Sequence, residues 1–478
     1  MRGVKEAKKM ITDGIGKNFI VYFDPDVDGA FAGVLPVGVL KRFGEYPLSL
    51  MNKNRMHGAL IDLSPYAGKY NTVISVDSHV PLEKVKEIVD LGFNFVSIDH
   101  HECGDEFIRY YNTENKCRGL VINNQYPFEN PEKRYLSGAG VVYEVFKEMF
   151  PDEDFDWFRD IVGITLLSDV RDISSEDAKV YLKYTYTSSK RNGYISYLIR
   201  ECSVYKSLYS FGFPSMDRSY INFVLSPTIN ALLRFNKTNV VLNFVLGKGL
   251  KEFMNDKQKQ LLEDTIKDHI QIKKVGSAAI VKVEDWREDV VMSNFIGLIA
   301  NRLLGRVATH ILCFVVNKDG SSRASFRSVK SEFNFLKEFN DAGYKAIGHK
   351  SAFGVLDFVE SKIPVNKVAE IVDKSCKVNF KRKYIEVSNL AIFRGTGKAK
   401  KVAEDNEYLP DKDRVLIQYV GNNIKLEKSA NKYKKYMIDG VPVMQFNELD
   451  KSMAGCLIDV SSSSGLLNFI FTSYKVND

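Results

Sequence analysis

Residues 23–29 read "FDPDVDG" and place Asp24, Asp26 and Asp28 at alternate positions before a glycine. Carboxylates this close together repel one another unless a cation is bound. The residues before them, "NFIVYF", have the composition of a strand, and the residues after them, "AFAGVLPVGVLKRFG", have the apolar period of a helix. A strand, an acidic turn and a helix in this order predict an α/β fold with a ligand site at the carboxyl end of the strand.

Two other kinds of acidic loop share part of this pattern. An EF-hand calcium loop requires a bidentate Glu at its twelfth position, which is Leu35 here, so an EF-hand is disfavoured. A haloacid-dehalogenase phosphatase also begins with aspartates after a strand, and its usual Thr or Val is Ala30 here. The turn by itself leaves that second interpretation open.

Three later apolar runs also end in candidate metal ligands. "YNTVISVDSHV" ends in Asp77, "GFNFVSIDHHECGDEF" carries the triplet Asp99-His100-His101, and the run from Ile161 ends at Asp169. The first two read as buried parallel strands joined by a crossover helix, so their carboxyl ends should meet at one edge of a sheet. One such acid is commonly a turn former or a helix cap, but four runs ending this way favour a shared site. Carboxylate and imidazole together suit Mn²⁺ or Mg²⁺.

Composition limits the class of protein. With 478 residues, the chain is long enough for two to four domains, and 45% hydrophobic with 27% charged residues is ordinary for a globular protein. No apolar run approaches the roughly 20 residues of a membrane span, so a cytoplasmic location is expected. The six cysteines form no C-x-x-C pair, which disfavours zinc knuckles and a disulfide framework. The net charge of +7 is compatible with a polyanionic partner and does not establish one.

Taken together, these residues resemble the DHH phosphoesterase superfamily, and within it the RecJ-like single-strand-specific exonucleases. The resemblance rests on the D-x-D-x-D-G turn, the triplet at 99–101 and, in order, "NKNRMHG", "LSGAGVVYEVF", "LLSDVRD" and "LSPTINALLRF". Smaller relatives carry a His where this chain has Tyr22, and they lack the last phrase. In the second half, "NFIGLIANRLLGR", "SSRASFRSV" and "AIGHKSAFG" resemble the DHH-associated domain; Ile347 replaces the first of the two glycines usual before His349.

The resemblance implies a two-metal phosphodiesterase. Two divalent ions about 4 Å apart would clamp the charge of the phosphodiester and activate water. The implied metal ligands are Asp24, Asp26, Asp28, Asp77, His100 and Asp169, with Asp77 the best candidate to bridge the ions. Asp99 is expected to orient a histidine, and His101 to act on the scissile phosphate as a transition-state stabiliser or leaving-group acid. The preferred ion is Mn²⁺, with Mg²⁺ as the alternative.

The resemblance also implies a set of substrate-binding residues. Arg55, Ser325 and Arg327 match positions that bind a 5′ phosphate, for which guanidinium groups are well shaped. Asn230 and Arg234 would hold the backbone further along the strand, and Gly348 and His349 would face the active site from the second domain. For Arg55 and Arg234 an ordinary surface ion pair is an equally good interpretation.

Four domains are predicted: a parallel-sheet DHH domain (1–190), a helical connector (191–270), a smaller α/β DHH-associated domain (271–374) and a β-rich C-terminal domain (375–478). The last is OB-like by analogy. It carries the basic stretches "FKRKY", "GKAKK" and "NKYKKY", and in the first and last of them basic residues are interleaved with aromatic ones. This pattern suits single-stranded nucleic acid, although a solvated basic face explains it as well.

These features predict a metal-dependent exonuclease that degrades single-stranded DNA from 5′ to 3′, releases mononucleotides and works in repair, recombination or replication. One alternative is a phosphodiesterase for short oligoribonucleotides or cyclic dinucleotides. Another is a non-catalytic replication scaffold, although every implied metal ligand is present. A helicase or a single-strand-binding protein is a plausible partner by analogy. The 5′-to-3′ direction and the DNA substrate are what the resemblance implies; the residues by themselves decide neither of them, nor the oligomeric state.

Overall fold

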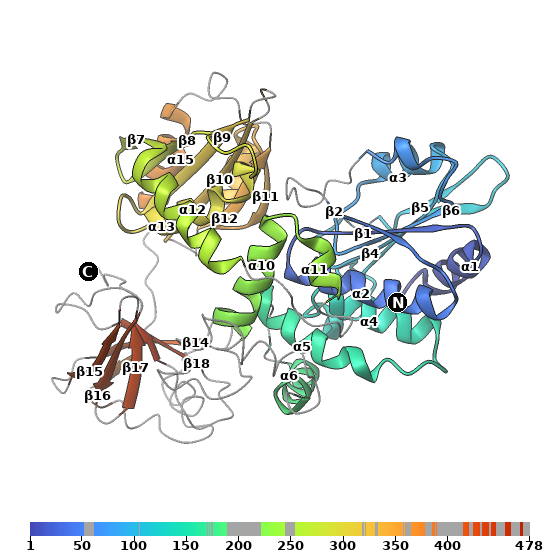
Figure 1. Ribbon diagram of the computed structural model, residues 1–478, viewed down its shortest axis with the longest axis horizontal. Coiled ribbons are helices and arrows are strands. Elements are labelled where there is room, and N and C mark those ends of the chain that lie inside the picture. Colours follow the sequence, from blue (N-terminus) through green and yellow to red (C-terminus); the bar gives the residue numbers. More distant parts are fainter. Residues whose placement is uncertain are drawn as a thin grey trace. The chain divides into compact units, whose positions relative to one another are not determined.

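The computed structural model of the protein (Figure 1) describes most of the first 377 residues and the strands of the C-terminal region. The described residues are 1–51, 62–104, 106–169, 171, 173, 175–188, 221–243, 254–317, 320, 322–329, 333–356, 358, 365–377, 385–387, 389, 414–419, 424–430, 433–438, 441–445, 455–459 and 469–471. The chain divides into two compact units. Unit 1 comprises Met1–Arg134, Gly138–Phe158 and Leu225–Phe380, and unit 2 comprises Tyr135–Ser137, Arg159–Val224 and Lys381–Asp478.

Unit 1 begins with a six-stranded sheet in the order β2-β1-β3-β4-β6-β5. Every neighbouring pair is parallel except β5–β6. In that order the strands are Leu48–Met51, Phe19–Phe23, Thr72–Val76, Asn94–Asp99, Cys117–Asn123 and Arg109–Tyr111. All residues of β1 and β3 are buried, which agrees with their largely apolar sequences, FIVYF and TVISV.

Helices cover both faces of this sheet. On one face lie α1 (Val4–Gly14), α2 (Val27–Arg42) and α4 (Gly138–Met149), and on the other lies α3 (Leu82–Asp90), as Figure 1 shows. The core on the α3 face joins the apolar side of that helix to side chains of four parallel strands. Short 3₁₀ turns occur at Ser64–Tyr66, Pro131–Lys133 and Asp156–Phe158. This doubly covered parallel sheet confirms the predicted α/β class.

A second six-stranded sheet of unit 1 has the order β11-β12-β10-β9-β8-β7. In that order the strands are Lys345–His349, Ala352–Leu356, Ser322–Ser328, His310–Val316, Ala278–Val283 and Ile270–Val275, and only β8–β9 is parallel. Helices α12 (Asn255–Asp268) and α13 (Ile296–Leu303) pack on one face, the latter preceded by a 3₁₀ turn at Met292–Asn294. Helices α14 (Phe335–Asp341) and α15 (Val365–Lys377) pack on the other face.

The residues of unit 2 up to Val224 form most of a π-helical turn, η4 (Ile221–Leu225). Unit 1 resumes at Leu225 and continues with α10 (Ser226–Arg234) and α11 (Thr238–Asn243). The π-helical turn runs directly into α10, whose second residue is a proline. Proline is tolerated there because the first N–H groups of a helix have no intrahelical acceptor. The helical character predicted for this part of the chain is therefore seen in the described residues.

Unit 2 contains α5 (Arg159–Ser168), which is the apolar run before Asp169, and α6 (Glu176–Ser188). The two helices approach closely because Gly163 has no side chain; a methyl group there would overlap Thr185. The Thr185 hydroxyl donates to the Asp160 carbonyl at 2.8 Å. This contact holds the start of α5 against α6.

The C-terminal region of unit 2 is a seven-stranded sheet in the order β13-β14-β18-β19-β17-β16-β15. In chain order, from β13 to β19, the strands are Ile385–Val387, Arg414–Tyr419, Ile424–Ala430, Tyr433–Ile438, Val441–Gln445, Gly455–Asp459 and Phe469–Phe471. The predicted β-rich character is confirmed, whereas the OB-like form and the four domain boundaries stay predictions. Among the residues described, no helix combines the length and apolar character needed to cross a membrane.

Candidate metal centre

The parallel strands of the first sheet deliver polar side chains to one edge. Asp24 directly follows β1, Asp77 follows β3, and Asp99 closes β4. All three are buried, as are Asp28 and His100. Because the carboxyl ends of parallel strands meet at the same edge, residues separated by more than fifty positions become neighbours.

The acidic turn is shaped by the start of α2. Asp26 is the N-cap of this helix, and its carboxylate accepts a hydrogen bond of 3.0 Å from the Gly29 N–H. A side chain at Gly29 would overlap the backbone of Asp24, so only glycine lets the turn close this tightly. The turn therefore holds the first two aspartates in a defined arrangement, with one oxygen of Asp26 engaged in capping.

Asp77 takes part in two potential ligand groups. Its carboxylate lies with those of Asp24 and Asp26, and separately with the ring nitrogens of His100 and His101; in each group the ligand atoms all lie within 4.8 Å of one another. Its backbone has a positive φ of 55°, and its N–H donates to the Ile98 carbonyl at 2.9 Å. A strained backbone held by the neighbouring strand is common at functional sites.

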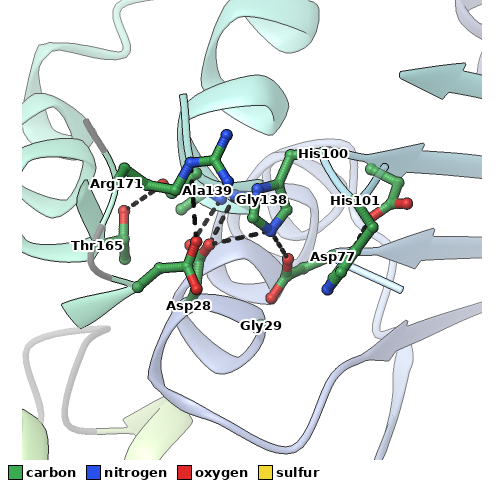
Figure 2. Close-up of polar contacts among 12 residues, drawn as sticks. Asp28, Gly29, Asp77, His100, His101, Gly138, Ala139, Thr165 and Arg171 are labelled. Carbon is green, nitrogen blue, oxygen red and sulfur yellow. Dashed lines mark hydrogen bonds and ion pairs between the residues drawn. The ribbon is translucent and has the colours of Figure 1, made fainter. Parts of the chain in front are cut away.

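Asp28 and Asp77 both face His100, as Figure 2 shows. The His100 Nε2 atom lies 2.9 Å from an oxygen of Asp77 and 3.8 Å from an oxygen of Asp28. Asp28 also accepts hydrogen bonds from two backbone N–H groups at the start of α4, Gly138 at 2.6 Å and Ala139 at 2.9 Å. Each carboxylate oxygen of Asp28 therefore accepts a hydrogen bond from one backbone N–H group.

Asp99 faces His101. Its carboxylate lies 2.8 Å from the His101 Nδ1 atom, and the two histidine rings are 4.6 Å apart. Burial raises the pKa of the Asp99 carboxyl, but the charge of His101, their hydrogen bond and the nearby His100 outweigh burial. The pKa of Asp99 therefore lies well below its usual range, and an ionised Asp99 fixes the orientation of His101.

Tyr22, at the position of the histidine in smaller relatives, is fully buried in β1. Burial, together with the negative charge of Asp24, raises the pKa of its phenol far above the usual value. The phenol stays protonated, so it does not offer the anionic oxygen that a cation prefers.

The donor set fits Mn²⁺ or Mg²⁺. Several buried carboxylates within a few ångströms are costly together, and a divalent cation removes that cost. These ions bind oxygen ligands, together with one or two imidazoles. Among the described groups that could hold a metal, none includes a cysteine. The residues that would hold such ions here are Asp24, Asp26, Asp28, Asp77 and His100.

Asp169 belongs to unit 2 and follows α5 directly. Its N–H donates to the Thr165 carbonyl at 2.9 Å, which continues the helical pattern for one residue. Its carboxylate lies 3.9 Å from the Arg171 guanidinium. Its role as a metal ligand stays a prediction.

The predicted phosphate-binding residues Ser325 and Arg327 lie two apart on β10 and touch each other. The Arg327 guanidinium donates to the Ser325 hydroxyl at 2.8 Å and to the Phe326 carbonyl at 2.7 Å. A side chain at Gly297, in the first turn of α13, would press on both residues. Burial lowers the pKa of Arg327 to about 10, so it stays cationic at neutral pH.

The other predicted substrate residues are spread over two elements. Asn230 and Arg234 lie on α10, and the Arg234 guanidinium donates to Gln258 at 3.3 Å. Gly348 and His349 end β11, where Gly348 has a φ of 140° and His349 is exposed. Gly348 alone supplies the unusual backbone angle, so Ile347 does not disturb the turn. Arg55 lies outside the described residues.

Asn123 is a site residue that the sequence analysis did not identify. It ends β6, one strand beyond Asp99, and its amide donates to the His101 carbonyl at 3.0 Å and to the Asp99 carboxylate at 3.4 Å. The run "LVIN" (residues 120–123), which ends in this residue, was a usable signal, because it is a further apolar run that ends in a polar side chain.

We expect Asn123→Ala to lower kcat roughly 10- to 100-fold, because the amide helps to fix the His101–Asp99 pair. Asn124→Ala is the matched control, since Asn124 is equally buried and donates at 2.7 Å to the Lys133 carbonyl instead. Thermal unfolding should show a comparable loss of stability in both variants. Equal kcat values in the two variants would remove Asn123 from the site.

A family comparison matches the N-terminal part of the chain. The model of the DHH family, N-terminal domain, matches residues 18–167, which contain the acidic turn, Asp77 and the triplet. Over these residues the chain is similar to the DHH family, and the predicted resemblance is confirmed there. A search of curated protein sequences returned no match.

Solved structures extend the comparison beyond the DHH domain. RecJ from Thermus thermophilus in complex with Mn²⁺ is similar with a TM-score of 0.66 and 14% identity, over 100% of this chain and 72% of that chain. The Mg²⁺ complex of the same RecJ is similar with a TM-score of 0.60 and 15% identity, over 99% of this chain and 70% of that chain. An exonuclease RecJ bound to manganese is similar with a TM-score of 0.55 and 16% identity, over 79% of this chain and 96% of that chain. At these identities the likeness shows that the chain has a RecJ-like fold.

Proposed function

We propose that this protein is a metal-dependent exonuclease that degrades single-stranded DNA from the 5′ end and releases mononucleotides. The observation that carries the proposal is the position of Asp77 in two ligand groups, one with Asp24 and Asp26 and one with the histidines. A shared carboxylate is what a pair of ions needs. The fold adds support, since the similar solved structures are those of RecJ, an exonuclease, with bound Mn²⁺ or Mg²⁺.

In this proposal each side chain has a separate task. Asp24, Asp26, Asp28, Asp77, His100 and Asp169 hold two divalent ions, which when bound would offset the charge of the phosphodiester and favour ionisation of the attacking water. His101 binds the scissile phosphate or protonates the leaving oxygen through its Nε2 atom, because its Nδ1 atom already faces Asp99. Asp99 keeps His101 in that orientation.

Substrate binding is assigned to the second sheet and the helices before it. Ser325 and Arg327 would hold the 5′ phosphate, with Arg55 as a further contact, because a guanidinium and a hydroxyl side by side match a terminal phosphate. Asn230 and Arg234 would hold nucleotides further along, and Gly348 and His349 would contact the strand near the reacting bond. The C-terminal sheet would bind the exposed strand, and a helicase or single-strand-binding protein would supply it.

The deciding experiment is digestion of a single-stranded DNA labelled at either end, in Mn²⁺, with a 5′ phosphate or a blocked 5′ end. We expect stepwise loss from the 5′ end and slow digestion of the blocked strand. Loss from the 3′ end would overturn the proposed polarity. Rapid cleavage of dinucleotides without digestion of long strands would indicate a small-substrate phosphodiesterase, and no hydrolysis with no Mn²⁺ binding would indicate a scaffold.

We expect Arg327→Lys to raise the KM for 5′-phosphorylated DNA roughly 10- to 100-fold, because lysine lacks the planar pair of donors and a hydrogen bond to a charged group contributes about 1.5–3 kcal/mol. The KM for 5′-hydroxyl DNA should change little. Arg287→Lys is the control: Arg287 forms two 2.7 Å contacts with Asp289 elsewhere in unit 1. Equal effects on both substrates would contradict a role in end recognition.

A further inference from the structure

We infer that the first turn of α4 is a positioning element for the metal centre, in which Gly138 and Ala139 set the carboxylates of Asp28 and Asp77. The inference rests on the proposed metal-dependent function. It adds a role for the glycine-containing sequence "LSGAG", to which the proposed mechanism assigns no task. It depends on two independent contacts of the same turn, one through backbone N–H groups and one through a missing side chain.

The first contact is with Asp28. Its two oxygens accept the N–H groups of Gly138 at 2.6 Å and Ala139 at 2.9 Å, from a position 110 residues away in the chain. The first N–H groups of a helix have no partner within the helix, and the helix dipole favours a negative charge beside them. Because each oxygen has two lone pairs, a carboxylate held in this way keeps acceptor capacity for a cation. The amides thus hold Asp28 in one orientation before any metal arrives.

The second contact is with Asp77. A methyl group on Gly138 would overlap the side chain of Asp77 at its β-carbon, its γ-carbon and one carboxylate oxygen. Asp77 is 2% exposed and its backbone is held at a positive φ by the Ile98 carbonyl, so it has little freedom to move away. Glycine at position 138 is therefore required for Asp77 to occupy the place where both ligand groups share it.

The two contacts together explain why this turn carries a glycine at its first helical residue. Any larger residue except proline keeps the N–H that binds Asp28 and pushes on Asp77, so the two carboxylates cannot both stay in place. The chain thus uses α4 to set the spacing of two acids from different elements, Asp28 in the first turn of α2 and Asp77 directly after β3. A misplacement of about 1 Å at such a site is expected to weaken metal binding and catalysis markedly.

The test is Mn²⁺ binding to full-length Gly138→Ala, measured by isothermal titration calorimetry, with thermal unfolding in the absence of metal as a check on folding. We expect Mn²⁺ affinity to fall roughly 10- to 100-fold while the metal-free protein stays folded. Gly38→Ala is the matched control: it makes the same change inside α2, where the new methyl group would lie at an ordinary 3.4 Å from the Trp157 ring. This control should bind Mn²⁺ like the wild type.

Electron paramagnetic resonance of the Mn²⁺-loaded protein separates positioning from a general loss of stability. The wild type should show the signal of an exchange-coupled Mn²⁺ pair, and folded Gly138→Ala should lose that coupling even at saturating Mn²⁺. If Gly138→Ala does not fold, Ala139→Pro replaces it, because proline removes one donor to Asp28 and suits the first turn of a helix. That variant should also bind Mn²⁺ more weakly.

Unchanged Mn²⁺ affinity and coupling in the folded variants would overturn the role of α4 and leave the nuclease proposal standing. Wild-type protein that binds Mn²⁺ but does not digest single strands would contradict the nuclease proposal, while the effect of Gly138→Ala on affinity would still decide the role of α4. Wild-type protein that binds no Mn²⁺ would overturn both.

Discussion

Asp77→Asn should reduce Mn²⁺-dependent hydrolysis of single-stranded DNA roughly 10³-fold or more. The substitution keeps the size of the side chain and removes the charge that both ligand groups share. Electrostatic stabilisation by a bound cation is worth several kcal/mol in the transition state, and each 1.36 kcal/mol is a factor of about ten. Asparagine also keeps an oxygen to face His100, which lies 2.9 Å from Asp77, so the fold should be retained.

Stability measurements give this prediction a second readout. Mn²⁺ should raise the unfolding temperature of the wild type, because a ligand that binds only the folded state stabilises it, and this rise should be small or absent in Asp77→Asn. Without metal the variant should be at least as stable as the wild type, since one of several crowded buried charges is gone. Asp90→Asn, at the exposed end of α3, is the control and should behave as wild type. Full activity in Asp77→Asn would refute the shared-ligand assignment.

His101→Ala should lower kcat about 10²- to 10⁴-fold, the usual range for loss of a general acid or base, while Mn²⁺ affinity stays close to that of the wild type. His101 also pairs with Asp99, which is 1% exposed and ionised, so alanine leaves a buried carboxylate without its imidazole. That loss should destabilise the variant by about 1–3 kcal/mol.

His101→Asn separates the two effects. The amide nitrogen of asparagine stands where Nδ1 of histidine stands and can still donate to Asp99, but nothing replaces Nε2. We therefore expect His101→Asn to lose kcat as severely as His101→Ala and to keep most of its stability in chemical unfolding. A kcat near wild type for His101→Asn would show that Nε2 has no part in the reaction, and a large loss of Mn²⁺ affinity would instead make His101 a metal ligand.

Much of the site could be predicted because strands of a parallel sheet end at one edge. The apolar runs before Asp24, Asp77 and Asp99 form buried strands. Strands that alternate with helices along the chain form a parallel sheet whose two faces are covered by those helices. The run before Asp169 is a helix instead. A short buried strand and a buried helix have the same apolar composition, so the sequence alone could not separate them.

Contacts made by the backbone could not be predicted in this way. The hydrogen bonds from α4 to Asp28 join positions 110 residues apart and depend on how α4 packs against α2. The N–H groups that donate them exist in every residue except proline, so no residue type marks them in advance. The amide of Asn123 was missed for a related reason: it supports the pair of His101 and Asp99 only because β6 lies beside β4.

Residue types and their spacing were enough to define the kind of chemistry: acids and histidines at the ends of apolar runs, an α/β core to carry them, and a basic β-rich C-terminal region. These features are local, because composition and period decide what a strand, turn or helix can present. Packing was needed to establish that Asp77 is shared by two ligand groups, that Asp99 serves His101, and that Gly138 must be glycine. Those facts concern distances of a few ångströms between distant segments, which the folded chain sets and local sequence does not.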